Sequence, residues 1–266
     1  RYNMLFKETA EEDYLPLIEG WEDPNPEPVL SWHDGIVVVR DDLLAAGSKL
    51  RAIDYLIGHA PEYKHVKEWV FGCCPATGYA QMSLPYVCNR YDKKAILFMA
   101  KRNPENYHEY QIKGMDYGAV YKWVNMGMLA VTKKRAQEYY EENKKERQVL
   151  PIGLEHPTVI ASIIKVARDI PYEPKEFWTV GSSGTLNRAL QLAWPDAAAN
   201  VVSVGHKMSE REIGDATYWR SELKFDKSVS EEDAPPFPSA PTYDAKAWKF
   251  IRENAKHGAL FWNVGA

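Results

Sequence analysis

The chain has 266 residues, of which 45% are hydrophobic and 26% are charged, and this composition is typical of a globular protein with enough apolar side chains for a large buried core. Its formal net charge of −4 excludes a general attraction of the whole molecule for nucleic acid or an anionic membrane. The cysteine count of 3, with two of the cysteines adjacent, fits neither a secreted disulfide framework nor a C-x-x-C metal site.

Two further absences bear on where the protein works. The sequence begins with no signal segment, and it contains no apolar run long enough to span a bilayer. Together with the cysteines, these observations predict a protein of the reducing cytoplasm that has no membrane segment.

The first half of the chain predicts alternating strands and helices. Residues 1–30 are polar and interrupted by proline, which indicates an irregular lead-in. The β-branched residues 36–39 predict a buried strand, and the sequence from Gly47 onward predicts a helix with Ser48 as its N-cap. In chain order, the patterns then predict a strand at 66–71, a helix at 78–87, a strand at 95–100, a helix at 115–126 and a charged helix at 133–147.

The second half continues the same alternation. The patterns predict a strand at 149–152, a helix at 157–170, a strand at 177–180, a helix after 185, a strand at 201–204, a loop at 226–242, a helix at 243–255 and a last strand at 259–262. Repeated alternation of this kind predicts an α/β fold with a mostly parallel sheet.

One junction stands out chemically, the stretch that follows the predicted strand at 177–180. Its loop consists of Gly181, Ser182, Ser183, Gly184 and Thr185, and a helix with apolar spacing follows. A strand, a tight loop and a helix N-terminus present backbone N–H groups and the positive end of the helix dipole, which suit phosphate. The loop lacks the lysine of a Walker loop and the G-x-G-x-x-G pattern, so an ordinary strand–helix turn is the alternative.

Other candidate patterns favour structural roles. The basic clusters at 133–135 and 144–147 alternate with glutamates, which is typical of a solvated helix face. The histidines show no H-x-x-x-H or H-E-x-x-H spacing, so we expect no metal site.

Several segments, taken together, resemble one enzyme family. Residues 37–43 and 47–56 resemble the R-D-D-L…G-N-K-x-R-K-L-E-Y-L stretch of the aminocyclopropanecarboxylate deaminase and D-cysteine desulfhydrase family. Further segments match its motifs in the same order: residues 71–79 its G-G-x-Q-S-N loop, 149–153 its Y-V-I-P-x-G-G segment, 181–185 its G-S-G-G-T phosphate loop, 241–247 its D-P-V-Y-[TE]-G-K-A segment, and 260–266 its L-F-L-H-T-G-G ending. The resemblance covers the chain from about residue 36 to the end.

The resemblance implies a fold-type-II pyridoxal-phosphate (PLP) enzyme of the tryptophan-synthase-β group. It implies a large PLP-binding domain formed by residues 1–54 and 149–266, a smaller α/β domain at 55–148, and the cofactor in the cleft between them. It also implies a homodimer.

The family's active-site positions fall on particular residues here. The resemblance implies that Lys49 forms the Schiff base with PLP and that Gly181, Ser182, Ser183, Gly184 and Thr185 hold its phosphate. It implies that Tyr243 is a catalytic nucleophile or acid and that Asp244 contacts the pyridine nitrogen. The alternatives are a surface lysine, a core tyrosine and a helix-capping aspartate.

The substrate loop departs from the family pattern. Thr77, Gly78 and Tyr79 would bind the substrate carboxylate at a helix start, but Gly78 replaces the family's asparagine. Ser48 replaces the asparagine that precedes the Schiff-base lysine, and Val264 replaces a threonine.

The resemblance therefore implies a PLP-dependent lyase that acts at the α-carbon of an amino acid by elimination, deamination or decarboxylation. One alternative is a decarboxylase of an amino acid attached to a hypermodified thymine in phage DNA, because reduced relatives of the family resemble such enzymes. The other alternative is a non-catalytic binding module that keeps the fold. The substrate is thus an amino acid, either free or attached to DNA.

Overall fold

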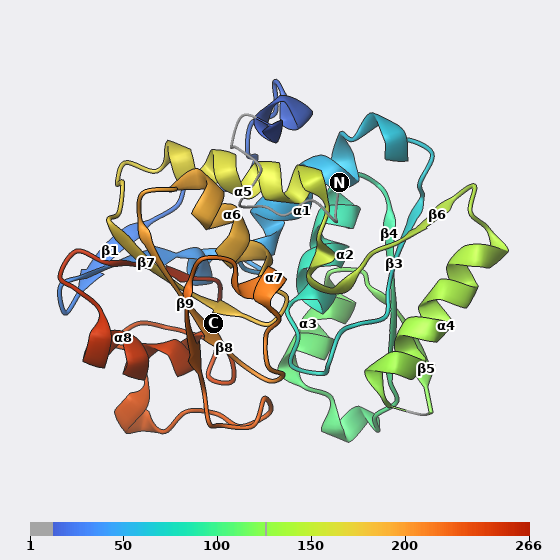
Figure 1. Ribbon diagram of the computed structural model, residues 1–266. Helices are drawn as coiled ribbons and strands as arrows, with labels where there is room; N and C mark the ends of the chain where they lie inside the picture. The colour runs from blue at the N-terminus through green and yellow to red at the C-terminus, as the bar shows by residue number, and fades with distance from the viewer. Residues whose placement is uncertain (1–12, 126) are drawn as a thin grey trace. The chain divides into compact units, whose positions relative to one another are not determined.

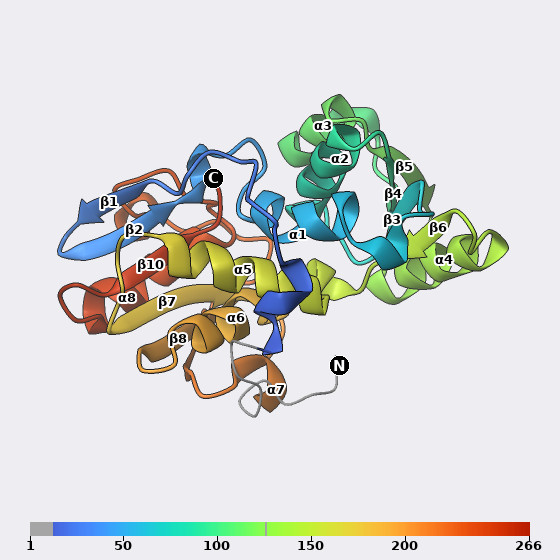
Figure 2. The ribbon, with the colours of Figure 1, turned by 90° about the horizontal axis from the view of Figure 1, so that it is seen from above.

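The computed structural model describes residues 13–125 and 127–266, and contacts along the chain divide it into two compact units. One unit, here called the discontinuous unit, consists of Arg1–Ala52 and His156–Ala266. The other, here called the inserted unit, consists of Ile53–Glu155. Figures 1 and 2 show the discontinuous unit mainly in blue and in yellow to red, and the inserted unit in light blue to green.

The described residues of the discontinuous unit form a six-stranded sheet in the order β1-β2-β10-β7-β8-β9. Its strands are β1 (Leu30–His33), β2 (Ile36–Arg40), β7 (Glu176–Gly181), β8 (Ala198–Ser203), β9 (Thr217–Arg220) and β10 (Leu260–Asn263). The pair β1–β2 is antiparallel, and the other neighbouring pairs are parallel. The parallel strands follow each other through helices, as their direction requires.

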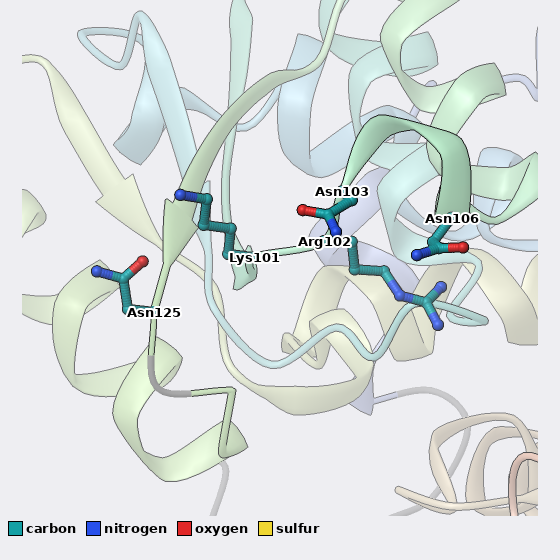
Figure 3. A pocket seen from close by; sticks show the side chains of 5 residues that line it. All are labelled: Lys101, Arg102, Asn103, Asn106 and Asn125. Atoms are coloured by element: carbon teal, nitrogen blue, oxygen red, sulfur yellow. The ribbon is translucent and has the colours of Figure 1, made fainter.

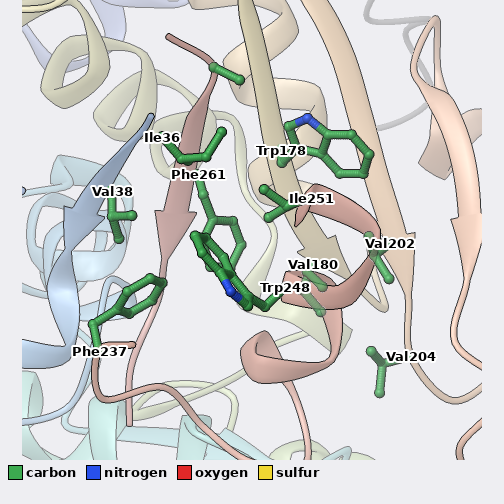
Figure 4. Close-up of a cluster of buried hydrophobic side chains, with 12 residues drawn as sticks. Ile36, Val38, Trp178, Val180, Val202, Val204, Phe237, Trp248, Ile251 and Phe261 are labelled. Atoms are coloured by element: carbon green, nitrogen blue, oxygen red, sulfur yellow. The ribbon is translucent and has the colours of Figure 1, made fainter. Parts of the chain in front are cut away.

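Burial on both faces explains the composition of the central strands. In β2, the four residues Ile36 to Val39 are all buried, and β10 is buried along its whole length. Strands covered on both faces are continuous hydrophobic runs rather than alternating ones. Figure 4 shows part of the resulting core, in which Phe237 packs edge-on against Trp248 with ring centroids 5.2 Å apart.

Among the described residues, five α-helices belong wholly or partly to the discontinuous unit. They are α1 (Lys49–Gly58), which runs across the boundary at 52/53, α5 (Pro157–Asp169), α6 (Thr185–Ala193), α7 (Glu210–Ile213) and α8 (Trp248–Asn254). The start of α5 shows why a helix begins there: Pro157 occupies its first turn, and the His156 ring accepts a hydrogen bond from the Thr158 backbone N–H at 3.1 Å. Helix α5 packs against α6.

The inserted unit contains a four-stranded parallel sheet, in the order β5-β4-β3-β6 among the described residues. Its elements are β3 (Glu68–Phe71), α2 (Ala80–Arg90), β4 (Lys94–Ala100), α3 (Glu109–Asp116), β5 (Val120–Val124), α4 (Leu129–Glu142) and β6 (Arg147–Val149). A smaller core of Val70, Ile96 and Ala136 joins two of the strands to α4. The predicted α/β fold with mostly parallel sheets is therefore confirmed.

The helix predicted at 115–126 is wrong. Helix α3 ends at Asp116, Gly118 has a φ of +93°, and residues 120–124 form β5, which pairs with β4. The aromatic and β-branched side chains of β5 favour a strand, and the glycine favours a helix end, over the apolar spacing that predicts a helix. The last residue of the predicted helix, Met126, lies outside the described residues.

Other predicted boundaries shift. The strand predicted at 149–152 is β6 at Arg147–Val149, and the charged helix predicted at 133–147 is α4 at Leu129–Glu142. Pro151 has no backbone N–H to donate, so the strand cannot continue through it. The sequence patterns miss β1, α7 and β9, which are each four residues long.

The predicted irregular lead-in at 1–30 is described from residue 13 onward. There it contains a short 3-10 helix, Leu15–Ile18, before β1 begins at Leu30; residues 1–12 lie outside the described residues. Within residues 13–125 and 127–266, no helix has the length and apolar character needed to cross a membrane.

Candidate active site

The loop between β7 and α6 has the geometry of an anion site. Strand β7 ends at Gly181 and α6 begins at Thr185, with Gly184 as the residue before the helix. Gly184 has a φ of +75°, and a Cβ atom there would lie 2.4 Å from the backbone oxygen of Glu212. Only glycine fits this position, because both the backbone conformation and the space exclude a side chain.

Hydroxyl groups and a buried guanidinium surround the same loop. The Ser183 and Thr185 hydroxyls lie 3.1 Å apart, and Arg188 donates to the Ser183 backbone oxygen at 3.4 Å. Burial and the neighbouring Arg211 lower the pKa of Arg188 to about 10, while Glu212 opposes the change. A helix N-terminus with hydroxyl donors and a nearby arginine favours a bound anion.

Lys49 is the first residue of α1, and the residues before it are held firmly. The Ser48 backbone N–H donates to the Val264 oxygen at 3.0 Å, which joins the start of α1 to the end of the chain. The Ser48 hydroxyl donates to Asp41 at 2.7 Å and accepts from the Trp262 indole at 3.0 Å. Ser48 therefore has a clear structural role, which is to fix the beginning of the helix that carries Lys49.

Asp41 is the centre of this support. It is fully buried and accepts hydrogen bonds from the Arg51 guanidinium, at 3.0 Å for the closest pair of atoms. Arg51 also pairs with Asp23 at 2.7 Å. A buried carboxylate needs several partners of this kind, since burying an unpaired charge is costly.

Asp244 presents an unusual buried carboxylate. It has no exposed surface, and one of its oxygens, Oδ2, accepts from the backbone N–H groups of Val264 at 2.7 Å and Gly265 at 3.1 Å. The other oxygen, Oδ1, is buried with no hydrogen-bond partner among residues 13–125 and 127–266. The alternative of a helix-capping aspartate is wrong, because the acceptor oxygen bonds the C-terminal segment instead of its own helix.

Electrostatics connect Asp244 to Lys49. Burial raises the pKa of Asp244 to about 7, whereas the two backbone N–H groups and the charge of Lys49 lower it and Asp42 raises it further. The amine and the carboxylate therefore interact within the same unit. The unpartnered oxygen is suited to accept from a cationic N–H group, since that contact would stabilise the ionised carboxylate.

Tyr243 connects Asp244 to the loop at 181–185. Its hydroxyl lies 3.5 Å from the Val180 backbone oxygen and receives hydrogen bonds from the side chain and backbone of Ser182. Burial raises the pKa of this phenol above its ordinary value, as does the neighbouring Asp244, and the Ser182 hydrogen bonds only partly oppose them. The structure thus brings together the loop, Tyr243, Asp244 and Lys49 in the discontinuous unit.

The predicted substrate loop belongs to the inserted unit. Thr77, Gly78 and Tyr79 are half-buried and lead into α2. A Cβ atom at Gly78 would lie 2.6 Å from the Cys74 sulfur, so the asparagine of the family pattern has no space in this conformation. The Tyr79 hydroxyl lies 3.4 Å from that of Tyr110.

A residue that the sequence patterns do not indicate, Gln81, holds this loop. The Gln81 amide donates to the backbone oxygens of Ala76 at 2.7 Å and Gly78 at 2.9 Å, and its oxygen accepts from Tyr121 at 3.0 Å. Gln81 is fully buried, and a long polar side chain beside the apolar Met82 and Leu84 in the first half of a helix is the signal that could have identified it. The sequence patterns also give no sign of the support that Trp262 gives to Ser48, because the two residues are 214 positions apart in the chain.

Comparisons with known proteins bear on the fold of the chain. No protein-family model matches the chain. A glycyl-dTMP PLP-dependent decarboxylase of Pseudomonas phage M6 is 24% identical over 263 residues, which cover 86% of this chain and 94% of the relative.

Solved structures show the same fold. An ACC deaminase homologue superimposes with a TM-score of 0.81 at 15% identity and covers 97% of this chain and 94% of its own. The processed threonine deaminase isoform 2 of Solanum lycopersicum gives a TM-score of 0.70 at 11% identity, covering 96% of this chain and 84% of its own. The chain therefore has the tryptophan-synthase-β-like fold of fold-type-II PLP enzymes, as the sequence resemblance implied.

Proposed function

We propose that this chain is a PLP-dependent lyase that acts at the α-carbon of an amino-acid substrate and binds its cofactor covalently through Lys49. The observation that carries the proposal is the buried Asp244 carboxylate, whose Oδ1 has no partner among the described residues and which interacts with Lys49. The names of the phage relative and of the deaminases with the same fold support the same chemistry.

The residues present fit the cofactor at both ends. Gly181, Ser182, Ser183, Gly184 and Thr185 would bind its phosphate at the N-terminus of α6, and Asp244 Oδ1 would accept from its protonated pyridine nitrogen. The Lys49 amine would bind its aldehyde carbon. When bound, PLP supplies an electron sink that accepts the electron pair of a bond broken at the α-carbon.

The chain's own groups would move the protons. Lys49 would take or return the proton at the substrate α-carbon, since the same amine is released when the substrate binds the cofactor. Tyr243 would act as an acid rather than a nucleophile, because its raised pKa keeps the phenol protonated at neutral pH.

Residues of the inserted unit would bind the substrate. Thr77, Gly78 and Tyr79 would hold the substrate carboxylate with the backbone N–H groups at the start of α2, in a loop that Gln81 keeps in shape. In this proposal, residues 1–54 and 149–266 form the PLP-binding domain and residues 55–148 form the smaller domain. The boundaries between compact units lie at 52/53 and 155/156.

A decarboxylase of an amino acid attached to a hypermodified thymine in phage DNA is the second candidate function. The name of the phage relative favours it, because that protein is a decarboxylase of glycyl-dTMP.

The compartment and the oligomeric state are also part of the proposal. The reducing cytoplasm would suit the free Cys73, Cys74 and Cys88. The family resemblance favours a homodimer.

Two measurements test the proposal. We expect the purified protein to bind PLP with the visible absorption band of a lysine-bound cofactor, and Lys49→Ala to lose that band. Absence of the band from the wild-type protein would contradict the proposal and favour a binding module. Persistence of the band in Lys49→Ala would contradict the role of Lys49 and assign the covalent bond to another lysine.

Products of the loaded enzyme then separate the reactions. Incubation with D-cysteine, aminocyclopropanecarboxylate, serine and glycyl-modified thymine in DNA is expected to yield ammonia and a keto acid for elimination, or carbon dioxide with the amine retained for decarboxylation. Turnover of the DNA substrate alone, with release of carbon dioxide, would select the second candidate function.

A further inference from the structure

The inserted unit contains a hollow of about 600 Å³ that the proposed chemistry does not use. Figure 3 shows its lining side chains, which are Lys101, Arg102, Asn103, Asn106 and Asn125, and we call this hollow the strand-end pocket. Each of these side chains is a cation or an amide, so the lining contains no carboxylate. Its volume is in the range of a small-molecule or nucleotide site.

The position of the pocket in the fold is that of a ligand site. Lys101 directly follows β4 and Asn125 directly follows β5, two neighbouring parallel strands. The Lys101 backbone N–H donates to the Val124 oxygen at 2.9 Å, which holds the two strand ends together. Ligands of open parallel sheets bind beyond the carboxyl ends of the strands.

The charges of the pocket are available to a ligand. Within residues 13–125 and 127–266, neither Lys101 nor Arg102 forms an ion pair with a carboxylate. Asn103 precedes the 3-10 helix Pro104–Asn106, and its side chain makes no capping hydrogen bond. Two cations with several amide donors match phosphate oxygens, which accept hydrogen bonds and carry negative charge.

A stack of aromatic rings adjoins the pocket along the chain. Tyr107 stacks on Trp123 with ring centroids 5.4 Å apart, and Trp123 stacks on Tyr121 at 5.0 Å. Tyr121 is fixed at the inner end, because its hydroxyl donates to Gln81, whereas Tyr107 is half-exposed and follows the lining residue Asn106. Aromatic rings beside cationic groups are the usual surface for nucleic-acid strands, since bases stack on the rings.

We propose that the strand-end pocket binds the phosphodiester backbone of a DNA strand, with Lys101 and Arg102 contacting its phosphates. The proposal rests on the second candidate function, in which the substrate amino acid is attached to DNA. It explains how a chain with a net charge of −4 binds a polyanion, because the positive charge is local.

Fluorescence anisotropy with a labelled single-stranded thymidine oligonucleotide tests the proposal. The double variant Lys101→Gln/Arg102→Gln is expected to bind at least tenfold more weakly than the wild type. For this variant, the slope of log K against the logarithm of the salt concentration should be shallower by about 1.4, since each of the two lost contacts with a single strand contributes about 0.7. The control Lys133→Gln/Lys134→Gln removes the same charge from exposed positions of α4 and should bind within twofold of the wild type.

Three results would overturn the proposal. The first is that the wild-type protein does not bind the oligonucleotide. The second is that both double variants lose the same affinity for it. The third is that inorganic phosphate or dTMP competes as strongly as unlabelled oligonucleotide. The last result would assign the pocket to a free phosphate or nucleotide.

The experiment also separates this proposal from the proposed lyase function. The Lys101→Gln/Arg102→Gln variant should keep the absorption band of the bound cofactor, and Lys49→Ala should lose that band but keep its affinity for the oligonucleotide. A protein with the band and no DNA binding contradicts only the pocket, whereas DNA binding without the band contradicts only the lyase.

Discussion

Asp244 differs from a capping aspartate in three respects: complete burial, hydrogen bonds to the C-terminal segment, and one oxygen without a partner in the described part of the chain. Such a group destabilises the free protein, since a buried polar atom without a hydrogen bond costs about 1–3 kcal/mol. A site that keeps this cost is prepared for a ligand with a matching N–H group. The unpartnered oxygen is the physical basis of the proposed contact with the pyridine nitrogen.

We predict that Asp244→Asn keeps the covalent attachment of PLP but lowers turnover by about 10²-fold, the effect of removing one preorganised electrostatic contact to developing charge. The asparagine oxygen can still accept from Val264 and Gly265, while its NH₂ group would face the ring nitrogen and favour the unprotonated form. Steady-state kinetics measure the turnover, and the absorption band of the same preparation reports the covalent attachment of PLP. Unchanged turnover with a normal band would contradict the role of Asp244.

The raised pKa of Asp244 should make the stability of the free protein depend on pH. Its folded pKa of about 7 lies above the ordinary value of 3.8, so between these values the folded state binds a proton that the unfolded state has lost. The carboxyl group therefore destabilises the fold increasingly as pH rises through this range, by on the order of 4 kcal/mol in total, and by a constant amount above it. Urea unfolding measures the free energy of unfolding of both proteins at each pH. The value for Asp244→Asn minus the value for the wild type should rise from pH 4 to pH 7 and then stay constant. A difference that is independent of pH would contradict the raised pKa.

At the scale of single elements, the junction of β7 and α6 depends on Gly184. Gly184→Ala should destabilise the protein by roughly 1–3 kcal/mol, since it combines a positive φ with a 2.4 Å approach to a backbone oxygen. It should also weaken PLP binding. Gly20→Ala is the matched control, because Gly20 has a similar φ of +81° but nothing within 4 Å of its Cβ position. Equal free energies of unfolding for the two variants would show that the close approach has no cost.

The start of α2 gives a second test at this scale. Gln81→Met removes both amide donors from the loop at 76–78 and leaves two backbone oxygens without them. We expect the KM of the amino-acid substrate to rise several-fold while the affinity for PLP stays within twofold, because the proposed PLP contacts belong to the discontinuous unit. Weakened PLP binding with an unchanged KM would assign this loop a different role.

Local patterns explain which elements the sequence could predict. The strand at 177–180, its loop and α6 follow each other directly, so a β-branched and aromatic run, two glycines and a helical spacing were sufficient. Strand β5 was missed because Val120 to Val124 also contain an apolar spacing compatible with a helix. The short β1 and β9 depend on their neighbours in the sheet. Helix α7 is a single turn, and its only local signal is the capping box formed by Ser209 and Glu212.

The site shows the same limit. The contacts from Tyr243 to Ser182 and from Asp244 to Val264 and Gly265 join residues that are distant in sequence, and no local pattern predicts them. Likewise, the contact of Ser48 with Trp262 and the close approach of the Cys74 sulfur to Gly78 explain why these two positions carry small residues, and no local pattern predicts either contact. The order of the motifs indicates which residues belong to the candidate site. The packing around those residues explains their chemical properties.

At the scale of the whole molecule, the chain has the same fold as solved structures with which it shares few identical residues. The ACC deaminase homologue matches 97% of this chain with a TM-score of 0.81, although only 15% of the residues are identical. Folds of this kind host different reactions, so the activity must be argued from the site. In this chain the proposed activity depends on the Lys49 amine, the buried Asp244 carboxylate and the loop at 181–185.

Reduction of the PLP-loaded protein with borohydride, followed by digestion and mass spectrometry, tests the central claim most directly. Reduction makes the bond between the cofactor and its lysine permanent, so the modified peptide identifies the amine. The account predicts that the pyridoxyl group is found on Lys49 and that Lys49→Ala carries none. A pyridoxyl group on another lysine, or none on any lysine of the wild-type protein, would contradict it.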